Sequence, residues 1–117
     1  MFDLQETIGK QNAANGWHKR FHDLDAGSDA ERDHVVSKIM LIVTELAEAV
    51  EELRDGRGIT ETYERDGKPE GFPVELADAV IRALDLAYMT GIDLEQVIKW
   101  KLDFNAGRGS MHSGKKL

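Results

Sequence analysis

Apolar and acidic side chains recur with helical spacing in residues 39–54, which read IMLIVTELAEAVEELR. Because a helix turns by about 100° per residue, four apolar side chains share one stripe, which we expect to be buried: Ile42, Leu46, Val50 and Leu53. Glu45, Glu48 and Glu52 fall on a different side of the same helix. The stretch is therefore predicted to be a core helix that also carries a carboxylate cluster.

A second stretch, residues 75–88, reads ELADAVIRALDLAY and repeats this arrangement. Its expected apolar stripe consists of Leu76, Val80, Ala83 and Ala87. Glu75 and Asp78 lie one helical turn apart and off that stripe. If the two helices lie antiparallel, their acidic pairs can face one another across the helix–helix contact.

The remaining pattern predicts two more helices and one long connection. Residues 1–17 form a moderately amphipathic first helix, and Ser28 or Asp29 can cap the helix that ends near Gly56. Residues 56–73 have no clear apolar period, so we expect a mobile loop with a short helical turn at residues 59–63. Pro73 suits the first turn of the next helix, and Asp93 can cap a last helix over residues 94–105. No stretch indicates a paired strand, so the predicted fold is all-α, with four main helices.

Length and charge narrow the class of protein. The 117 residues suit one domain, with an N-terminal helix and loop (1–29), a helical core (30–105) and a basic, Gly-rich tail (106–117). The formal net charge of −7 argues against general nucleic-acid binding, which needs a basic surface. The absence of cysteine suits a reducing cytoplasm, and no apolar run approaches the length of a membrane span. We therefore expect a cytoplasmic protein that binds neither membrane nor nucleic acid.

The two acidic pairs indicate a cation site. Clustered carboxylates repel one another, and a solvated helix would intersperse Lys or Arg about four residues away. Such pairs are common on solvated faces, but a second pair on a neighbouring helix favours Mg²⁺, which takes oxygen ligands. Lys101 and Asn105 share a helix face, and Arg108 follows them in the basic C-terminal part. The alternative interpretation of this part is a solvated tail without a binding role. Acidic residues that can bind a metal and basic residues that can bind phosphate together suggest that the ligand is a nucleotide polyphosphate.

These residues resemble the MazG-like nucleoside triphosphate pyrophosphohydrolases of the all-α NTP pyrophosphatase superfamily. The resemblance covers residues 35–116 and rests on Glu45-x-x-Glu48, the following Glu51-Glu52, Glu75-x-x-Asp78 and Lys101-x-x-x-Asn105-x-x-Arg108. It implies a four-helix, MazG-like domain that assembles as a homodimer or homotetramer, with sites that a second subunit can complete.

The resemblance also implies a reaction and a role for each matching residue. The reaction is hydrolysis of a nucleoside triphosphate between the α- and β-phosphates, giving a monophosphate and pyrophosphate. Mg²⁺, or Mn²⁺ in its place, would be held by Glu45, Glu48, Glu75 and Asp78. Phosphates would be held by Lys101, Asn105, Arg108 and Lys115 or Lys116. Glu48 and Glu52 are the candidates for taking a proton from the attacking water.

Other interpretations remain open from the sequence. A di-iron carboxylate bundle is disfavoured because neither acidic pair is followed by the required His. A helical interaction module that binds metal or nucleotide without turnover remains an alternative, as does a relative acting on phosphoribosyl-ATP. Trp17 can stack on a base but is expected in the core, and His18, His22 and His34 are expected to serve packing or the surface.

Overall fold

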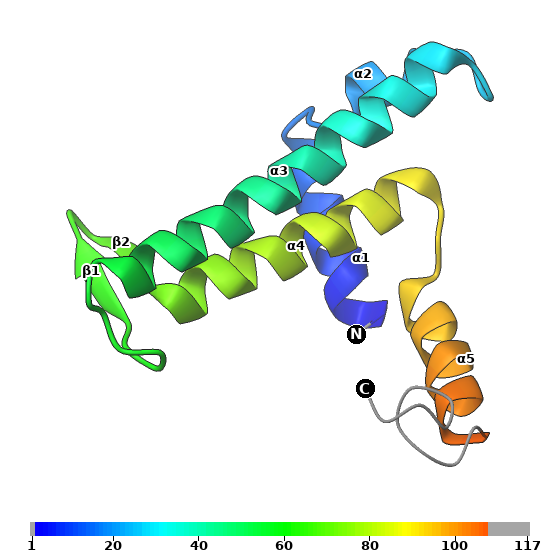
Figure 1. Cartoon of the computed structure of the whole chain (residues 1–117). Helices are drawn as coiled ribbons and strands as arrows, with labels where there is room; N and C mark the ends of the chain where they lie inside the picture. Colours follow the sequence, from blue (N-terminus) through cyan, green and yellow to red (C-terminus); the bar gives the residue numbers. More distant parts are fainter. Residues whose placement is uncertain (1, 108–117) are drawn as a thin grey trace.

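A computed structural model describes residues 2–107 of the chain, which are mostly helical (Figure 1). In chain order the elements are α1 (Phe2–Ala14), α2 (Lys19–His22), α3 (Asp29–Arg54), β1 (Tyr63–Arg65), β2 (Lys68–Glu70), α4 (Phe72–Thr90) and α5 (Leu94–Gly107). The two longest helices, α3 and α4, lie side by side and antiparallel, and the β1–β2 hairpin caps one end of the pair. The four expected main helices are therefore present, with α2 as a short addition.

The ends of α3 and α4 follow the predicted signals. Ser28 is the N-cap of α3, and its hydroxyl oxygen accepts a hydrogen bond from the Glu31 amide at 3.1 Å. Pro73 lies in the first turn of α4, and Gly91 ends that helix with a left-handed backbone (φ 77°). The expected cap of α5 also forms, because the Gln96 amide donates to a carboxylate oxygen of Asp93 at 3.2 Å.

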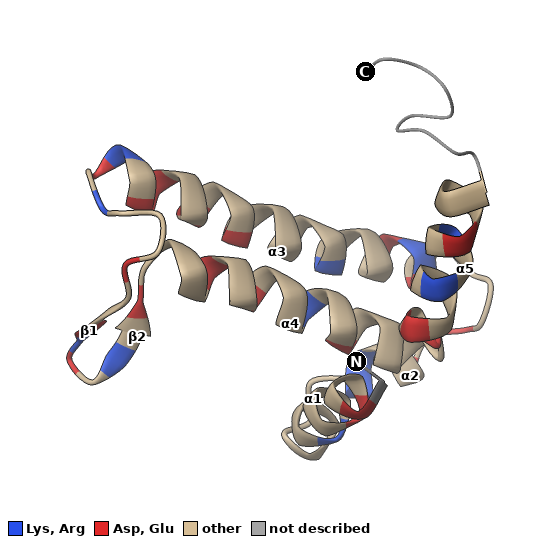
Figure 2. Cartoon of the chain, turned by 90° about the horizontal axis from the view of Figure 1, so that it is seen from below, with Lys and Arg blue, Asp and Glu red and all other residues tan. Residues whose placement is uncertain are grey.

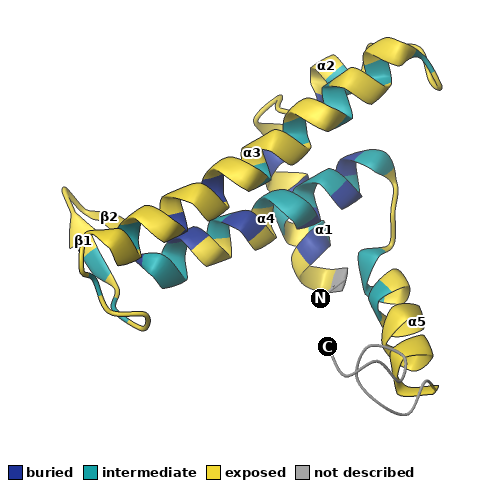
Figure 3. Cartoon of the chain, viewed as in Figure 1, coloured by how far each residue is buried: buried dark blue, intermediate teal, exposed yellow. Residues whose placement is uncertain are grey.

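The first helix packs against α4 and ties the start of α5 in place. The side chain of Gln5, only 3% exposed, donates to the carbonyl of Ile92 at 2.7 Å and accepts from the Leu94 amide at 3.4 Å. The buried apolar residues of the described chain are few, and four of the five belong to α4: Ala49, Ala79, Leu84, Ala87 and Met89 (Figure 3). The core is therefore small for the length of the helices.

The predicted buried stripe of α3 is wrong. Leu46 and Val50 are 45% and 54% exposed, whereas Glu45 and Ala49 are buried against α4. The same holds at the start of α4, where Leu76 is exposed and Glu75 is buried. A helix that packs on one neighbour buries only a narrow face, and here that face carries the acids and alanines. The more apolar stripe of α3 faces outward.

The expected loop 56–73 contains a β-hairpin that the sequence pattern did not predict. Strands β1 and β2 pair antiparallel, with Tyr63 opposite Glu70 and Glu64 opposite Pro69. The turn between them is Asp66-Gly67, and both residues have positive φ (54° and 78°), as a type I′ turn requires. The expected helical turn at residues 59–63 is absent. The Asp-Gly pair was the available signal, but three-residue strands show almost no alternation.

The last helix stands apart from the α3–α4 pair (Figure 1). Within the described residues, α5 is attached mainly through its first turn, and Trp100, Leu102 and Phe104 are 75%, 59% and 54% exposed. Across residues 2–107, none of the helices combines the length and apolar character needed to cross a bilayer.

Candidate metal and phosphate site

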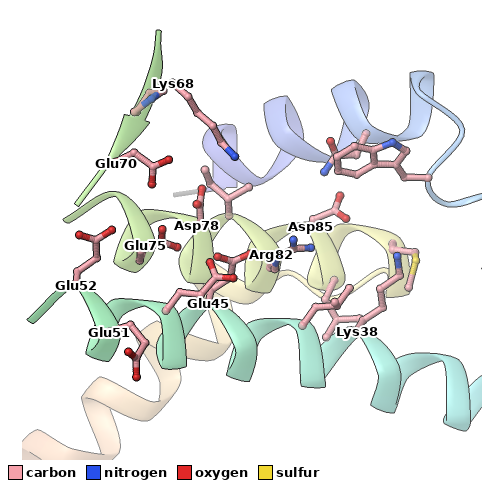
Figure 4. A pocket seen from close by; sticks show the side chains of 18 residues that line it. Lys38, Glu45, Glu51, Glu52, Lys68, Glu70, Glu75, Asp78, Arg82 and Asp85 are labelled. Atoms are coloured by element: carbon pink, nitrogen blue, oxygen red, sulfur yellow. Dashed lines mark hydrogen bonds and ion pairs between the residues drawn. The ribbon is translucent and has the colours of Figure 1, made fainter. Parts of the chain in front are cut away.

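A strongly charged cleft runs along the contact between α3 and α4. Its volume is about 690 Å³, within the range of small-molecule sites. The hairpin borders one end of the cleft and α1 the other, and acidic positions recur along both long helices (Figures 2 and 4). The charged lining residues are Lys38, Glu45, Glu48, Glu51, Glu52, Lys68, Glu70, Glu75, Asp78, Arg82 and Asp85.

The start of α4 is fixed in a way that sets the position of Glu75. Gly71, just before this helix, is buried and has φ 123°, and a Cβ at this position would overlap the carbonyl oxygen of Glu61. Its own carbonyl accepts the Glu75 amide at 3.0 Å. The connection after the hairpin therefore packs closely enough to bring the first turn of α4 against the acidic part of α3.

Three predicted acidic residues come together as expected. One carboxylate oxygen from each of Glu45, Glu48 and Glu75 lies within 4.8 Å of the other two. Asp78 lines the same cleft but is not part of this closest group. A second group with the same spacing consists of Glu52, Glu70 and Glu75. Glu75 is common to both groups.

Glu75 is the most strongly perturbed carboxyl in the cleft. It is 7% exposed, and its Oε2 atom has no hydrogen-bond partner. Burial is the largest cause that raises the pKa of Glu75, and the contacts with Glu45 and Glu48 and the charge of Asp78 add to it, so that the pKa reaches about 8. A buried carboxylate without a donor has a large desolvation cost, which a cation at this place would offset.

The pKa of Glu45 changes in the opposite direction, because Glu45 contacts a basic side chain of the protein. The Arg82 guanidinium donates to Glu45 Oε1 at 2.8 Å. Burial would raise the pKa of Glu45, but the hydrogen bond from Arg82 and the contact with Glu75 outweigh burial and lower it. Asp78 has a raised pKa, first through burial and then through the charge of Glu45. Burial and the neighbouring acids therefore favour a proton on Glu75, whereas Arg82 favours the charge on Glu45.

The cleft also contains basic residues that the sequence pattern did not predict there. Lys38, Lys68 and Arg82 all line it, and the charge of Lys68 lowers the pKa of Asp78. Arg82 follows Asp78 by four residues on α4, so helical spacing could have identified it. Lys68 and Glu70 are brought to the cleft by the hairpin, for which only the Asp-Gly turn gave a signal.

Of the predicted phosphate-binding residues, the two that the structure describes do not reach this cleft within one chain. Lys101 and Asn105 are exposed on α5 and are not among the lining residues. Lys101 instead lies over the ring of Phe104, with Nζ 5.1 Å from the ring centroid. Arg108 and Lys115 lie outside the described residues. Their role in phosphate binding stays a prediction.

The end of the cleft near α1 has a different character. Trp17 lines it and is 56% exposed, so the expectation that this residue belongs to the core is wrong. Asn12, from the same side, is 8% exposed and also lines the cleft. His18 is buried, as packing would require, and it contacts Asp85 at 2.8 Å. This partner is 67 residues away in sequence, so no local spacing could have revealed it.

No protein-family model matches this chain, and searches of curated proteins and of solved structures find none that is similar to it. Its function is therefore inferred from the geometry of the cleft and from the motifs it contains.

Proposed function

We propose that this protein is a Mg²⁺-dependent hydrolase that converts nucleoside triphosphates to monophosphates and pyrophosphate. The observation that carries the proposal is the group Glu45, Glu48 and Glu75, whose oxygens lie within 4.8 Å in a cleft of nucleotide size. The buried Glu75 oxygen that has no donor supports a cation there. The MazG-like motifs in the sequence agree with this chemistry.

The carboxylates of this group, with Asp78 beside them, would hold Mg²⁺. When bound, Mg²⁺ offsets the charge of the triphosphate and activates water for attack. Glu48 is the exposed member of the group and is therefore the better placed of the two candidates to accept a proton from water. The carboxylate of Glu52, the other candidate, already accepts a hydrogen bond from the Tyr63 hydroxyl at 2.9 Å.

Basic residues of the same cleft would hold the phosphates. Lys68 reaches the cleft from β2 and Lys38 from α3, so cations lie on both sides of the carboxylates. Cations in these positions stabilise the negative charge that develops on a pyrophosphate leaving group. Arg82 is already paired with Glu45 and orders that carboxylate.

The nucleoside would lie toward α1. Trp17 offers an exposed aromatic ring on which a base can stack, and Asn12 offers an amide with both a donor and an acceptor. The cleft thus has the acidic groups and Lys68 toward the hairpin and an aromatic side chain toward α1, the two parts that a nucleoside polyphosphate requires (Figure 4).

The assembly that we propose is a homo-oligomer formed through α3. Its outward stripe has a heptad spacing, with every member between 37% and 55% exposed: Val36, Ile39, Val43, Leu46, Val50 and Leu53. Each of these side chains has about half of its surface left to bury, which contributes roughly 1 kcal/mol, so six of them in one interface would favour a second copy packed here. The radius of gyration, 17.2 Å, exceeds the ~13 Å of a compact domain of this length. A second copy would complete the four-helix core that one chain lacks.

The assembly is tested by a charge placed in the stripe. We expect Leu46→Glu to shift the protein to a monomer in light scattering coupled to size exclusion, because a charge would be buried without a partner. Ala77→Glu, at an exposed position of α4, is the comparison variant. Dimers that persist at low concentration in Leu46→Glu would contradict the proposed interface.

The activity is tested with a panel of ribo- and deoxyribonucleoside triphosphates, with and without Mg²⁺, and products resolved by phosphorus NMR. We expect monophosphate and pyrophosphate, and we expect Glu48→Gln or Asp78→Asn to abolish turnover with the helical circular dichroism retained. Glu64→Gln, an exposed carboxyl on β1, should keep full activity. Orthophosphate and diphosphate as products would refute α–β cleavage. Nucleotide binding without any product would instead indicate a non-catalytic module.

A further inference from the structure

The hairpin adds a carboxylate to the cleft that the acidic helix pairs do not include. Tyr63 and Glu70 are directly opposite one another in the β1–β2 register, so their side chains lie on the same face of the hairpin. The Tyr63 hydroxyl contacts both carboxylate oxygens of Glu52, at 3.0 and 2.9 Å. This contact holds that face of the hairpin against α3 and turns Glu70 toward the cleft (Figure 4).

The resulting group has the composition of an oxygen-ligand cation site. One oxygen from each of Glu52, Glu70 and Glu75 lies within 4.8 Å of the others. Around a Mg²⁺ or Mn²⁺ ion, ligand oxygens about 2.1 Å from the metal are separated by roughly 3–4 Å, so small side-chain rotations would suffice. Three carboxylates at this spacing otherwise repel one another.

The burial of Glu75 also points to a ligand at this place. Glu75 is more than nine-tenths buried, and its Oε2 atom lacks a hydrogen-bond partner. Because its carboxylate belongs to both acidic groups, one oxygen can serve each of two cations. Paired metal ions in phosphoryl-transfer sites lie about 3.5–4 Å apart, a separation that one bridging carboxylate spans.

We propose that Glu52, Glu70 and Glu75 bind a second divalent cation, with Glu75 bridging it to the first. The β1–β2 hairpin is then part of the metal centre: β2 supplies Glu70 as a ligand and Lys68 as a phosphate partner. Cation binding would fix the hairpin over the end of the cleft. The use of this cation in catalysis rests on the proposed function, whereas its binding does not.

The test is titration of the protein with Mn²⁺ alone, followed by calorimetry and by electron paramagnetic resonance. We expect the wild-type protein to bind two Mn²⁺ ions per chain, with the exchange-coupled signal of a close pair. Glu70→Gln should bind the first ion normally and weaken the second at least ~10-fold, with loss of the coupled signal. Glu64→Gln, on the other face of the same hairpin, should behave as wild type. Glu70→Asp, which keeps the charge, should weaken the second ion less than Glu70→Gln.

Two results would overturn the proposal: a single Mn²⁺ per wild-type chain, or two unchanged ions in Glu70→Gln with native circular dichroism. These outcomes are separable from failure of the proposed function. A protein that binds two Mn²⁺ ions and loses one in Glu70→Gln but cleaves no triphosphate would refute the activity only. A protein that releases pyrophosphate but binds one Mn²⁺ would refute the second site only.

Discussion

Replacing Glu75 by Gln distinguishes the effect of this carboxyl on the stability of the metal-free protein from its role in binding Mg²⁺. Glutamine has nearly the same shape as glutamate and carries no charge. In the metal-free protein, Glu75 is buried among other carboxyls and its Oε2 atom has no donor. We therefore expect Glu75→Gln to stabilise the metal-free protein above neutral pH and to remove stabilisation by Mg²⁺.

The magnitude follows from the pKa of this carboxyl. Its value is raised from 4.5 to about 8, first by burial and then by Glu45 and Glu48. Linkage converts that difference to a ceiling of roughly 5 kcal/mol. Water and salt reach the mouth of the cleft, so we expect about 2 kcal/mol at physiological ionic strength.

The direction in which stability changes with pH depends on whether the folded or the unfolded state holds the Glu75 proton. Between pH 4.5 and about 8 the folded protein keeps the Glu75 proton while the unfolded chain releases it. The stability contributed by the neutral carboxyl is therefore complete below pH 4.5, falls as pH rises and is lost above about pH 8. Glutamine stays neutral at every pH, so the difference between variant and wild type grows across this window.

The assay is urea unfolding followed by circular dichroism at several pH values from 5 to 9, with a chelator and then with excess Mg²⁺. Wild type should lose stability with rising pH in chelator and regain it with Mg²⁺. Glu75→Gln should show a flatter pH dependence and no gain with Mg²⁺. The exposed carboxyl of Glu64 provides the matched control, because Glu64→Gln should follow wild type in every condition.

The expected role of Glu75 would be refuted if Glu75→Gln were less stable than wild type at pH 8 in chelator. It would also be refuted by equal stabilisation of the two proteins by Mg²⁺, since a cation held by Glu75 must distinguish them.

Two further predictions concern the contacts that support the cleft. Gly9→Ala should destabilise the fold by at least ~2 kcal/mol in urea unfolding, because its Cβ would overlap the ring of Tyr88 where α1 meets α4. Gly107→Ala, which meets nothing within 4 Å, should have little effect, and equal losses in the two variants would contradict this packing argument. Arg82→Ala should cost about 1–3 kcal/mol in the metal-free protein, because it leaves the buried Glu45 without its donor. Added Mg²⁺ should recover part of that loss in a thermal unfolding assay, and a variant with wild-type stability in chelator would show that the pair contributes nothing.

Local signals in the sequence predicted the helices and their ends well. Ser28, Pro73 and Asp93 all act at the positions expected, because caps depend on neighbours within one helical turn. The sequence also indicated that the two acidic motifs can meet, because each belongs to one of two helices that can lie antiparallel. It did not predict the helix faces that bring them together.

Local signals in the sequence did not predict which face of each helix is buried. The apolar stripe through Leu46 and Val50 predicted the buried side of α3, yet α4 packs against the side carrying Glu45 and Ala49. Periodicity identifies a face but not the partner that covers it. The outward stripe is the one that we propose a second copy covers.

The helical segments, their caps and the acidic pairs follow from the sequence alone, because these features depend on residues within a few positions of one another. The groups that share the cleft are set by the tertiary structure. It placed Lys68 and Glu70 beside Glu75 through a hairpin, and it joined His18 to Asp85 across 67 positions. Such long-range contacts depend on how elements pack, and the spacing of residues along the chain carries no record of that packing.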